Sequence, residues 1–228
     1  NIGGGTIALN AGTLRTTFDG ALGNALDWGN SGTGTIAAAA GTALRLTGTI
    51  NAFGNAAVGF GNATDTGTVI LASANSYSGY TVVNGGTLQL DDLGGLGSSA
   101  VELNAGTLRT AVTGSLSNYL YWNGGTTGAI AAATGTTLTL TGQASFFGTT
   151  AQFGTAGDDG TIVAAFSGGM TGGGPRRLLI GGGTFRTAGI GVMNLLIGSI
   201  EVVQIDAGAV LDLYAGQPST TLHSLEGA

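Results

Sequence analysis

The stretch Leu-Asn-Ala-Gly-Thr-Leu-Arg-Thr occurs twice in this chain, at residues 9–16 and again at residues 103–110. In each copy an Asn-Ala-Gly step, typical of a tight turn, leads into a segment in which apolar and polar residues alternate. Such alternation places successive side chains on opposite faces of a β-strand. The stretch therefore predicts a short strand that begins at a turn, used at two points that lie 94 residues apart.

The match between the two stretches continues along the chain. Residues 7–72 and 101–166 are two copies of one module, in which Trp28 corresponds to Trp122. Each tryptophan shares the parity of a neighbouring leucine that is expected to face inward. We therefore expect both indole rings to pack into the core at a corner of the fold.

A shorter period lies inside the module. Gly-Thr steps that open an apolar alternation recur every 19 to 29 residues, at positions 12, 41, 67, 86, 106, 135, 160 and 183. Residues 135–142, Gly-Thr-Thr-Leu-Thr-Leu-Thr-Gly, alternate strictly, so each recurrence predicts a short half-buried strand. Periods of about 20–50 residues are typical of solenoids and propellers.

A repeat of this length holds two or three short strands with their corners, and stacked repeats pair equivalent strands in parallel about 4.8 Å apart. We predict an all-β fold, a right-handed parallel β-helix of about ten rungs with a 94-residue super-repeat. It forms one segment over residues 1–228, with module copies at 7–100 and 101–202 and a partial third copy at 203–228. A propeller is the alternative, but its blades usually need about 40–50 residues.

Composition narrows the classes of function. Glycine supplies 46 of the 228 residues, charged residues only 8%, and the formal net charge is −6. The negative sign excludes a basic nucleic-acid binder, and the absence of cysteine excludes disulfides and thiolate metal sites. The chain holds no apolar run of about 20 residues free of Gly, Thr and Asn, so we expect no membrane insertion by this segment.

Residues 78–97 read Ser-Gly-Tyr-Thr-Val-Val-Asn-Gly-Gly-Thr-Leu-Gln-Leu-Asp-Asp-Leu-Gly-Gly-Leu-Gly. This text resembles the passenger-associated β-strand repeat of bacterial autotransporters, with Tyr80 in place of a glycine. The resemblance implies an exported passenger on the bacterial cell surface, and a segment of a longer protein with a signal peptide and a membrane β-barrel elsewhere. Residues 166–178 fit the repeat poorly and are expected to form a loop.

Few side chains offer catalytic chemistry. His223 is the only histidine, cysteine and lysine are absent, and no Gly-x-Ser-x-Gly elbow occurs. The doublets Asp91-Asp92 and Asp158-Asp159 are candidates for a glycosidase pair, but their Asp/Gly context favours a role in turns. Residues 94–99 carry serine where a calcium-binding nonapeptide needs aspartate. We therefore predict no enzyme activity, no catalytic residues, no cofactor or cofactor-binding residues and no metal site.

Two sets of residues are candidates for a binding surface. Arginine recurs at one repeat position that alternation places outside the core, at Arg15, Arg109 and Arg186. We interpret these side chains as solubilising groups on a solvent-facing side, with a ligand-binding ladder as the alternative. Aromatic residues that could bind a glycan or a protein are Tyr77, Tyr80, Tyr119 and Tyr121. Binding residues beyond these candidates are not assigned.

The predicted function is that of an extracellular, cell-surface autotransporter passenger segment, a structural stalk or adhesin in attachment, self-association, filament or biofilm formation. Repeated strands without a catalytic constellation favour this interpretation. The expected partners are further copies of the chain, or a host or cell-surface protein or glycan, and not nucleic acid. The alternative is a β-helix protein that binds or degrades polysaccharide.

Overall fold

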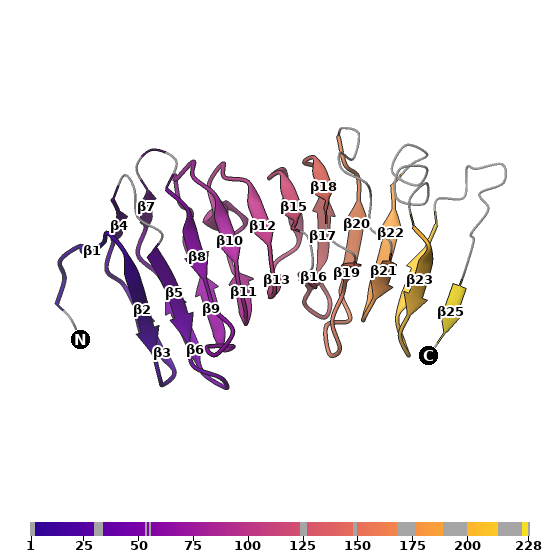
Figure 1. The fold of residues 1–228 in the computed structure, drawn as a ribbon, viewed down its shortest axis with the longest axis horizontal. Coiled ribbons are helices and arrows are strands. Elements are labelled where there is room, and N and C mark those ends of the chain that lie inside the picture. Colours follow the sequence, from indigo (N-terminus) through magenta and orange to yellow (C-terminus); the bar gives the residue numbers. More distant parts are fainter. Residues whose placement is uncertain are drawn as a thin grey trace. The chain divides into compact units, whose positions relative to one another are not determined.

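The computed structural model describes residues 3–29, 34–52, 54, 56–123, 127–147, 150–167, 177–188, 200–213 and 225–227. The chain forms two compact units, Asn1–Arg109 and Thr110–Ala228, which Figure 1 colours from indigo to magenta and from magenta to yellow. In the described residues the one helix is a short 3-10 helix, Leu93–Leu96, and all other regular structure is strand. No described helix has the length and apolar character that crossing a membrane requires.

The first unit is built from strands of three to five residues joined by tight corners. They are β1 (Ile7–Leu9), β2 (Gly12–Thr16), β3 (Gly20–Leu22), β4 (Leu26–Trp28), β5 (Gly34–Ala38), β6 (Ala43–Leu46), β7 (Ile50–Ala52), β8 (Val58–Phe60), β9 (Thr68–Leu71), β10 (Thr81–Val83), β11 (Thr87–Leu90), β12 (Val101–Leu103) and β13 (Thr107–Thr110). The sheet orders are β1-β4-β7, β2-β5-β8-β10-β12 and β3-β6-β9-β11-β13. Neighbours pair in parallel, so each strand stacks on its equivalent in the next turn.

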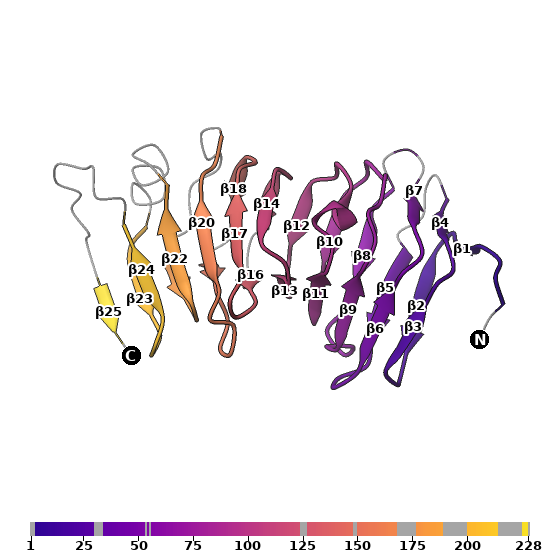
Figure 2. The ribbon, with the colours of Figure 1, turned by 180° about the vertical axis from the view of Figure 1, so that it is seen from behind.

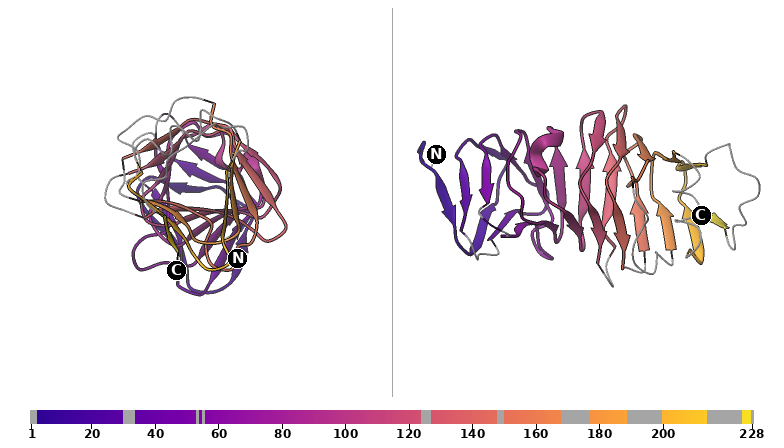
Figure 3. Two further views of the ribbon diagram at one scale, coloured as in Figure 1. Left: turned by 90° about the vertical axis from the view of Figure 1, so that its right-hand side faces the viewer. Right: turned by 90° about the horizontal axis from the view of Figure 1, so that it is seen from above.

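Stacked apolar columns hold these turns together, as the alternation predicts. Leu44 lies opposite Val69, and Val69 opposite Leu88, and all three side chains are buried. Full burial of each such side chain contributes about 1.5–3 kcal/mol. The end-on view in Figure 3 shows the strands of this unit arranged around its core.

The second unit repeats this construction. Its strands are β14 (Gly114–Leu116), β15 (Leu120–Trp122), β16 (Ala129–Ala132), β17 (Thr137–Leu140), β18 (Ala144–Phe146), β19 (Thr150–Phe153), β20 (Thr161–Ala164), β21 (Arg177–Ile180), β22 (Thr184–Thr187), β23 (Val202–Ile205), β24 (Val210–Asp212) and β25 (Leu225–Gly227). The orders are β14-β17-β20-β22-β24, which Figure 2 shows from behind, β16-β19-β21-β23-β25, and the pair β15-β18. The predicted parallel β-solenoid is therefore confirmed in each unit.

Aromatic rings form part of the second core. Trp122 stacks on Phe146 with ring centroids 4.6 Å apart, and Phe153 stacks on Phe185 at 4.3 Å. Trp28 and Trp122 are both fully buried, which confirms the expectation that the two indoles pack in the core.

The 94-residue module is out of phase with the turns. Strands β2 and β12 belong to one sheet and are separated by four successive strand pairings, which correspond to four turns. Strand β13 follows β12 in the chain. In the sequence, however, the equivalent of β2 is β13. One module therefore equals four turns plus one strand, and equivalent strands belong to different sheets.

Two expectations need correction. The structure has about eight turns rather than ten. Residues 3–6 precede the first strand and belong to no turn. The loop expected over residues 166–178 lies largely outside the described residues, and its end is wrong because Arg177 begins β21, opposite Thr150.

Candidate functional site

Three of the described carboxylates among the catalytic candidates make hydrogen bonds and ion pairs within their own unit. Within the described part of the chain, no group of three His, Asp or Glu side chains is placed to hold a metal ion. Asp92 accepts a hydrogen bond from the Gly94 amide (2.8 Å) and caps the 3-10 helix, while Asp158 accepts one from the Thr155 hydroxyl (2.8 Å). These two carboxylates act in turns, as their sequence context predicts. His223 lies outside the described residues.

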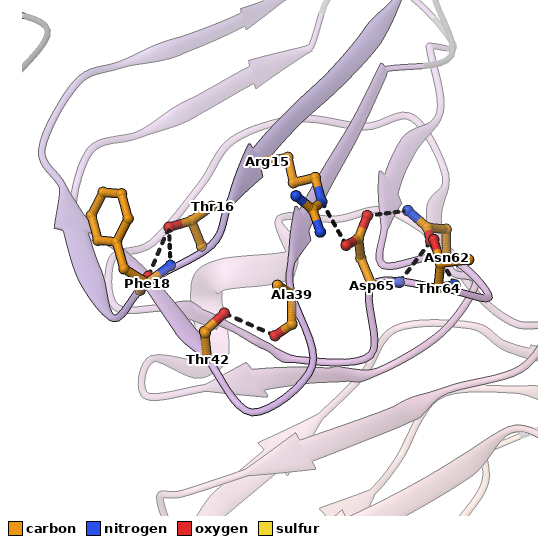
Figure 4. A network of polar contacts seen from close by, with 8 residues as sticks. All are labelled: Arg15, Thr16, Phe18, Ala39, Thr42, Asn62, Thr64 and Asp65. Carbon is orange, nitrogen blue, oxygen red and sulfur yellow. Dashed lines mark hydrogen bonds and ion pairs between the residues drawn. The ribbon is translucent and has the colours of Figure 1, made fainter.

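Arg15 reaches across two turns of the first unit to a buried carboxylate. Its Nε donates to Asp65 Oδ1 at 2.6 Å, and the Asn62 amide donates to the other oxygen at 3.0 Å (Figure 4). The Asn62 amide and the Arg15 guanidinium hold the pKa of Asp65 below its ordinary value of 3.8, against the opposing effect of burial. Asn62 also accepts from the Asp65 and Thr64 amides, so the pair is fixed to a rigid corner.

A longer polar chain crosses another face of the first unit. Arg45 donates to Asp91, Gln89 donates to the other oxygen of Asp91 at 2.7 Å, and Arg109 donates to Gln89 at 2.7 Å. Burial raises the pKa of Asp91, but the hydrogen bonds from Gln89 and Arg45 outweigh it and leave that pKa lowered. This chain connects side chains from three turns, at β6, β11 and β13, and passes over β9 between the first two.

The recurrent arginines face outward, as alternation predicts, and they also join turns, which was not expected: in the second unit, Arg186 Nε donates to Asp212 Oδ2 at 2.6 Å. Sequence reasoning missed these partners because Arg15 and Asp65 lie 50 residues apart. Only the stacking of turns brings such residues together.

The four candidate tyrosines occupy different environments, and Tyr77 was wrongly grouped with them. Its side chain is buried, and its hydroxyl bonds with Thr81 (2.7 Å), which in turn bonds with Ser99 (2.9 Å). Burial raises the pKa of Tyr77 to about 12. Tyr80 is 54% exposed, but it belongs to the first unit, whereas Tyr119 and Tyr121 belong to the second.

Tyr119 and Tyr121 form an outward aromatic cluster with a residue of the next turn. Tyr121 in β15 lies opposite Ser145 in β18, and its ring meets that of Phe147 with centroids 5.2 Å apart and planes tilted by 43°. The Tyr119 hydroxyl forms a short hydrogen bond with the Ser145 hydroxyl. Phe147 is 52% exposed, whereas both tyrosines are half-buried. We call Tyr119, Tyr121 and Phe147 the aromatic cluster.

Inward residues of the same two strands fix the cluster from below. Trp122 is buried against Phe146, and its Nε1 donates to the Gly128 carbonyl at 2.9 Å. Because successive side chains of a strand point to opposite faces, Tyr121 and Phe147 face outward. Phe147 was missed from sequence, although the doublet Phe146-Phe147 at a strand end gave a signal: one ring must point in and the other out.

The first module carries different residues at the same positions. Tyr119 and Tyr121 correspond to Ala25 and Asp27, and Ser145 corresponds to Asn51. There, Asn51 donates to Asp27 at 2.9 Å across paired strands β4 and β7. The module therefore folds with a hydrophilic pair in place of the tyrosines, so the fold itself does not require aromatic side chains here. Phe53, the counterpart of Phe147, lies outside the described residues.

Comparison with known proteins now identifies one part of the chain. Residues 62–90 match the model of the passenger-associated-transport-repeat family. These residues are similar to a repeat of autotransporter passengers. Over 84 residues, the chain is also 37% identical to the adhesin BmaC autotransporter of Brucella suis biovar 1 (strain 1330), a match that covers 36% of this chain and 2% of that protein. No solved structure matches the chain.

The passenger repeat coincides with a short turn of the first unit. It runs from the Asn62 corner through β9 and β10 to the end of β11, and Thr68 in β9 pairs with Thr87 in β11. Its Asn-Gly-Gly step has a steric basis, because Gly86 has φ +62° and a Cβ there would lie 2.5 Å from the Gly67 carbonyl oxygen. The repeat therefore encodes close contact between successive corners. The resemblance seen at residues 78–97 is confirmed over residues 78–90, and residues 91–97 lie beyond the family match.

Proposed function

We propose that this chain is a non-enzymatic segment of an autotransporter passenger, displayed on the bacterial cell surface, where it acts as an adhesive stalk. The observation that carries the proposal is the passenger repeat at residues 62–90, together with the similarity to a protein named as an adhesin. On this proposal, outward side chains of the solenoid contact another cell, a surface or a further copy of the chain.

The chemistry of the described surface supports a structural rather than a catalytic role. Arg15, Arg45 and Arg186 each bind a carboxylate of another turn. Carboxylates held in this way have lowered pKa values at Asp65 and Asp91, which suits an ion pair, whereas a general acid needs a raised value. These charged arginine and aspartate side chains therefore join turns of the solenoid.

Deletion of the 228-residue segment from its parent protein tests the proposal. We expect cells that carry the shortened protein to attach less to surfaces and to aggregate less, with equal amounts of passenger on the cell surface. Deletion of a segment of the same length elsewhere in the passenger is the control for stalk length. Unchanged attachment and aggregation would contradict the proposal, as would turnover of any polysaccharide by the purified segment.

A further inference from the structure

We propose that the aromatic cluster of Tyr119, Tyr121 and Phe147 is a binding site for a neutral saccharide chain. The proposal deepens the adhesive function proposed above and rests on it, because it names the class of partner that one surface of the second unit binds. Four observations carry it: the outward orientation of the rings, their support, the uncharged side chains beside them on the same strands, and the contrast with the first module.

The rings are placed to contact a flat ligand. Phe147 and Tyr121 come from adjacent turns, and their centroid separation of 5.2 Å with a 43° tilt forms a shallow aromatic surface. The polarised C–H groups on one face of a pyranose are attracted to the electron-rich face of an aromatic ring. Tyr119 extends this surface along β15, and its hydrogen bond with Ser145 holds its hydroxyl in place.

The surface is pre-organised, which lowers the entropic cost of binding. Each outward ring alternates with a buried one: Trp122 follows Tyr121, and Phe146 precedes Phe147. The two buried rings stack with centroids 4.6 Å apart, and the paired strands fix their spacing. A saccharide therefore meets rings whose positions are already set by the core.

The outward positions of β15, β18 and their flanks hold polar but uncharged side chains beside the rings. These positions are Ser117, Tyr119, Tyr121, Asn123, Gln143, Ser145 and Phe147, of which the Ser145 side chain is buried. None of these seven side chains carries a charge at neutral pH. Amide and hydroxyl groups beside aromatic rings are instead suited to the hydroxyl and C–H groups of an uncharged sugar.

The size of the cluster favours a sugar over a protein. A stable protein interface buries about 800 Å² on each partner, whereas a fully buried aromatic side chain contributes about 150–250 Å². Three aromatic residues, two of them already half-buried, supply only part of that area. The three aromatic side chains are, however, large enough to cover a few pyranose rings.

The first module provides the strongest argument that the cluster has a binding role. At the same positions it has Ala25 and Asp27 beside the same inward Leu and Trp, and it folds into the same paired strands. Exposed aromatic residues that the fold does not need are typical of binding surfaces.

The test is isothermal titration of the 228-residue chain with neutral hexasaccharides of glucose, mannose and galactose, and with hexagalacturonate as an acidic probe. We expect binding of at least one neutral probe and no binding of the acidic one. Tyr121→Asp, which installs the residue of the first module, should weaken binding by about tenfold or more. Tyr121→Phe, which keeps the ring, should retain it.

Further variants distinguish a loss of saccharide binding from a loss of folding. Tyr119→Ala gives a second loss, and circular dichroism checks that each variant is folded. The double variant Ala25→Tyr/Asp27→Tyr in the first module should add a second site and raise the binding stoichiometry. This gain does not depend on any destabilising change in the second unit.

Each outcome decides the proposal. Binding of no neutral probe, preference for hexagalacturonate, or binding unchanged by Tyr121→Asp would overturn the saccharide site. If cells then still attach through the intact segment, the adhesive function stands and the saccharide site alone is wrong. If Tyr121→Asp abolishes attachment to protein-coated surfaces while sugars do not bind, the cluster serves a protein partner and the inference is likewise overturned.

Discussion

The two copies of Leu-Asn-Ala-Gly-Thr-Leu-Arg-Thr share one sequence but lie on different faces of the first unit. In each copy a strand ends at leucine, a corner follows, and a new strand contains Thr-Leu-Arg-Thr. The surroundings differ: Leu14 is half-buried and lines a hollow of about 330 Å³, whereas Leu108 is fully buried. Local sequence thus sets strand and corner, and the position among the turns sets burial.

The arginines of the two copies also differ in their surroundings, although their neighbours in sequence are identical. Arg15 binds Asp65 across two turns, while Arg109 binds Gln89 in the neighbouring strand. Identical neighbours in sequence therefore lead to different contacts: Arg15 binds a carboxylate directly, whereas Arg109 binds Gln89, which itself donates to Asp91. Two pairs of substitutions at equivalent positions, and a third pair that compares the contacts of the two arginines, test how far this contrast extends.

The largest effect is expected at the inward leucine. Leu108→Ala removes a fully buried side chain and should lower the free energy of unfolding by about 2–5 kcal/mol. Leu14→Ala removes a half-buried one and should cost about 1 kcal/mol or less. Urea denaturation of both variants measures the difference. Equal losses would show that burial in the two copies is the same, contrary to the structure.

A smaller effect is expected at the corner glycine, with a different cause in each copy. A Cβ on Gly106 would lie 2.8 Å from Val83 Cγ1, so Gly106→Ala should cost about 1–3 kcal/mol through crowding. Gly12 faces open space but has φ +108°, so Gly12→Ala should cost about 1–2 kcal/mol through backbone strain. The measurement is urea denaturation of both single variants.

A double-mutant cycle separates these two causes. Val83→Ala removes Cγ1 and should relieve part of the cost of Gly106→Ala, while leaving the cost of Gly12→Ala unchanged. The same coupling energy for both glycines would refute the assignment of crowding to one and strain to the other.

The smallest effect concerns pH. Because the pKa of Asp65 is lower in the folded chain than its ordinary value of 3.8, its contacts add stability above that pH. This contribution is lost as the pH falls through the folded-state pKa. Thermal unfolding should therefore show Asp65→Asn less stable than the parent chain at pH 6, with the difference shrinking below about pH 4. Arg109→Gln should show a smaller pH dependence of the same sign, because the Arg109 charge is the last-ranked of the contributions that lower the pKa of Asp91.

Much of the fold could be predicted because its signals are local. Alternation of Thr137 to Leu140, the Gly-Thr steps and the parity of Trp122 depend on adjacent residues, and the structure confirms the strand and the buried indole. The phase between module and turn could not be predicted, since it depends on turns of unequal length. The turn from β9 to β11 takes 19 residues, whereas that from β19 to β21 takes 27.

The candidate site was less predictable for the same reason. Tyr119 and Tyr121 were selected from sequence, but Ser145 and Phe147 join them only through the pairing of β15 with β18. Tyr77 was misassigned because no alternation marks its position, and its burial depends on Thr81 and Ser99. Strands can be predicted from neighbouring residues, whereas contacts between turns depend on residues that are far apart in the sequence.

The phase of the module has a consequence for how such a chain evolves. A module equal to four turns plus one strand does not return to its starting sheet, so duplication of the module moves each inherited strand into a different sheet. Two successive duplications place one ancestral residue in three sheets without a single substitution. The new copy is then free to diverge, as Asp27 and Tyr121 have done, in a direction that the older copy does not occupy.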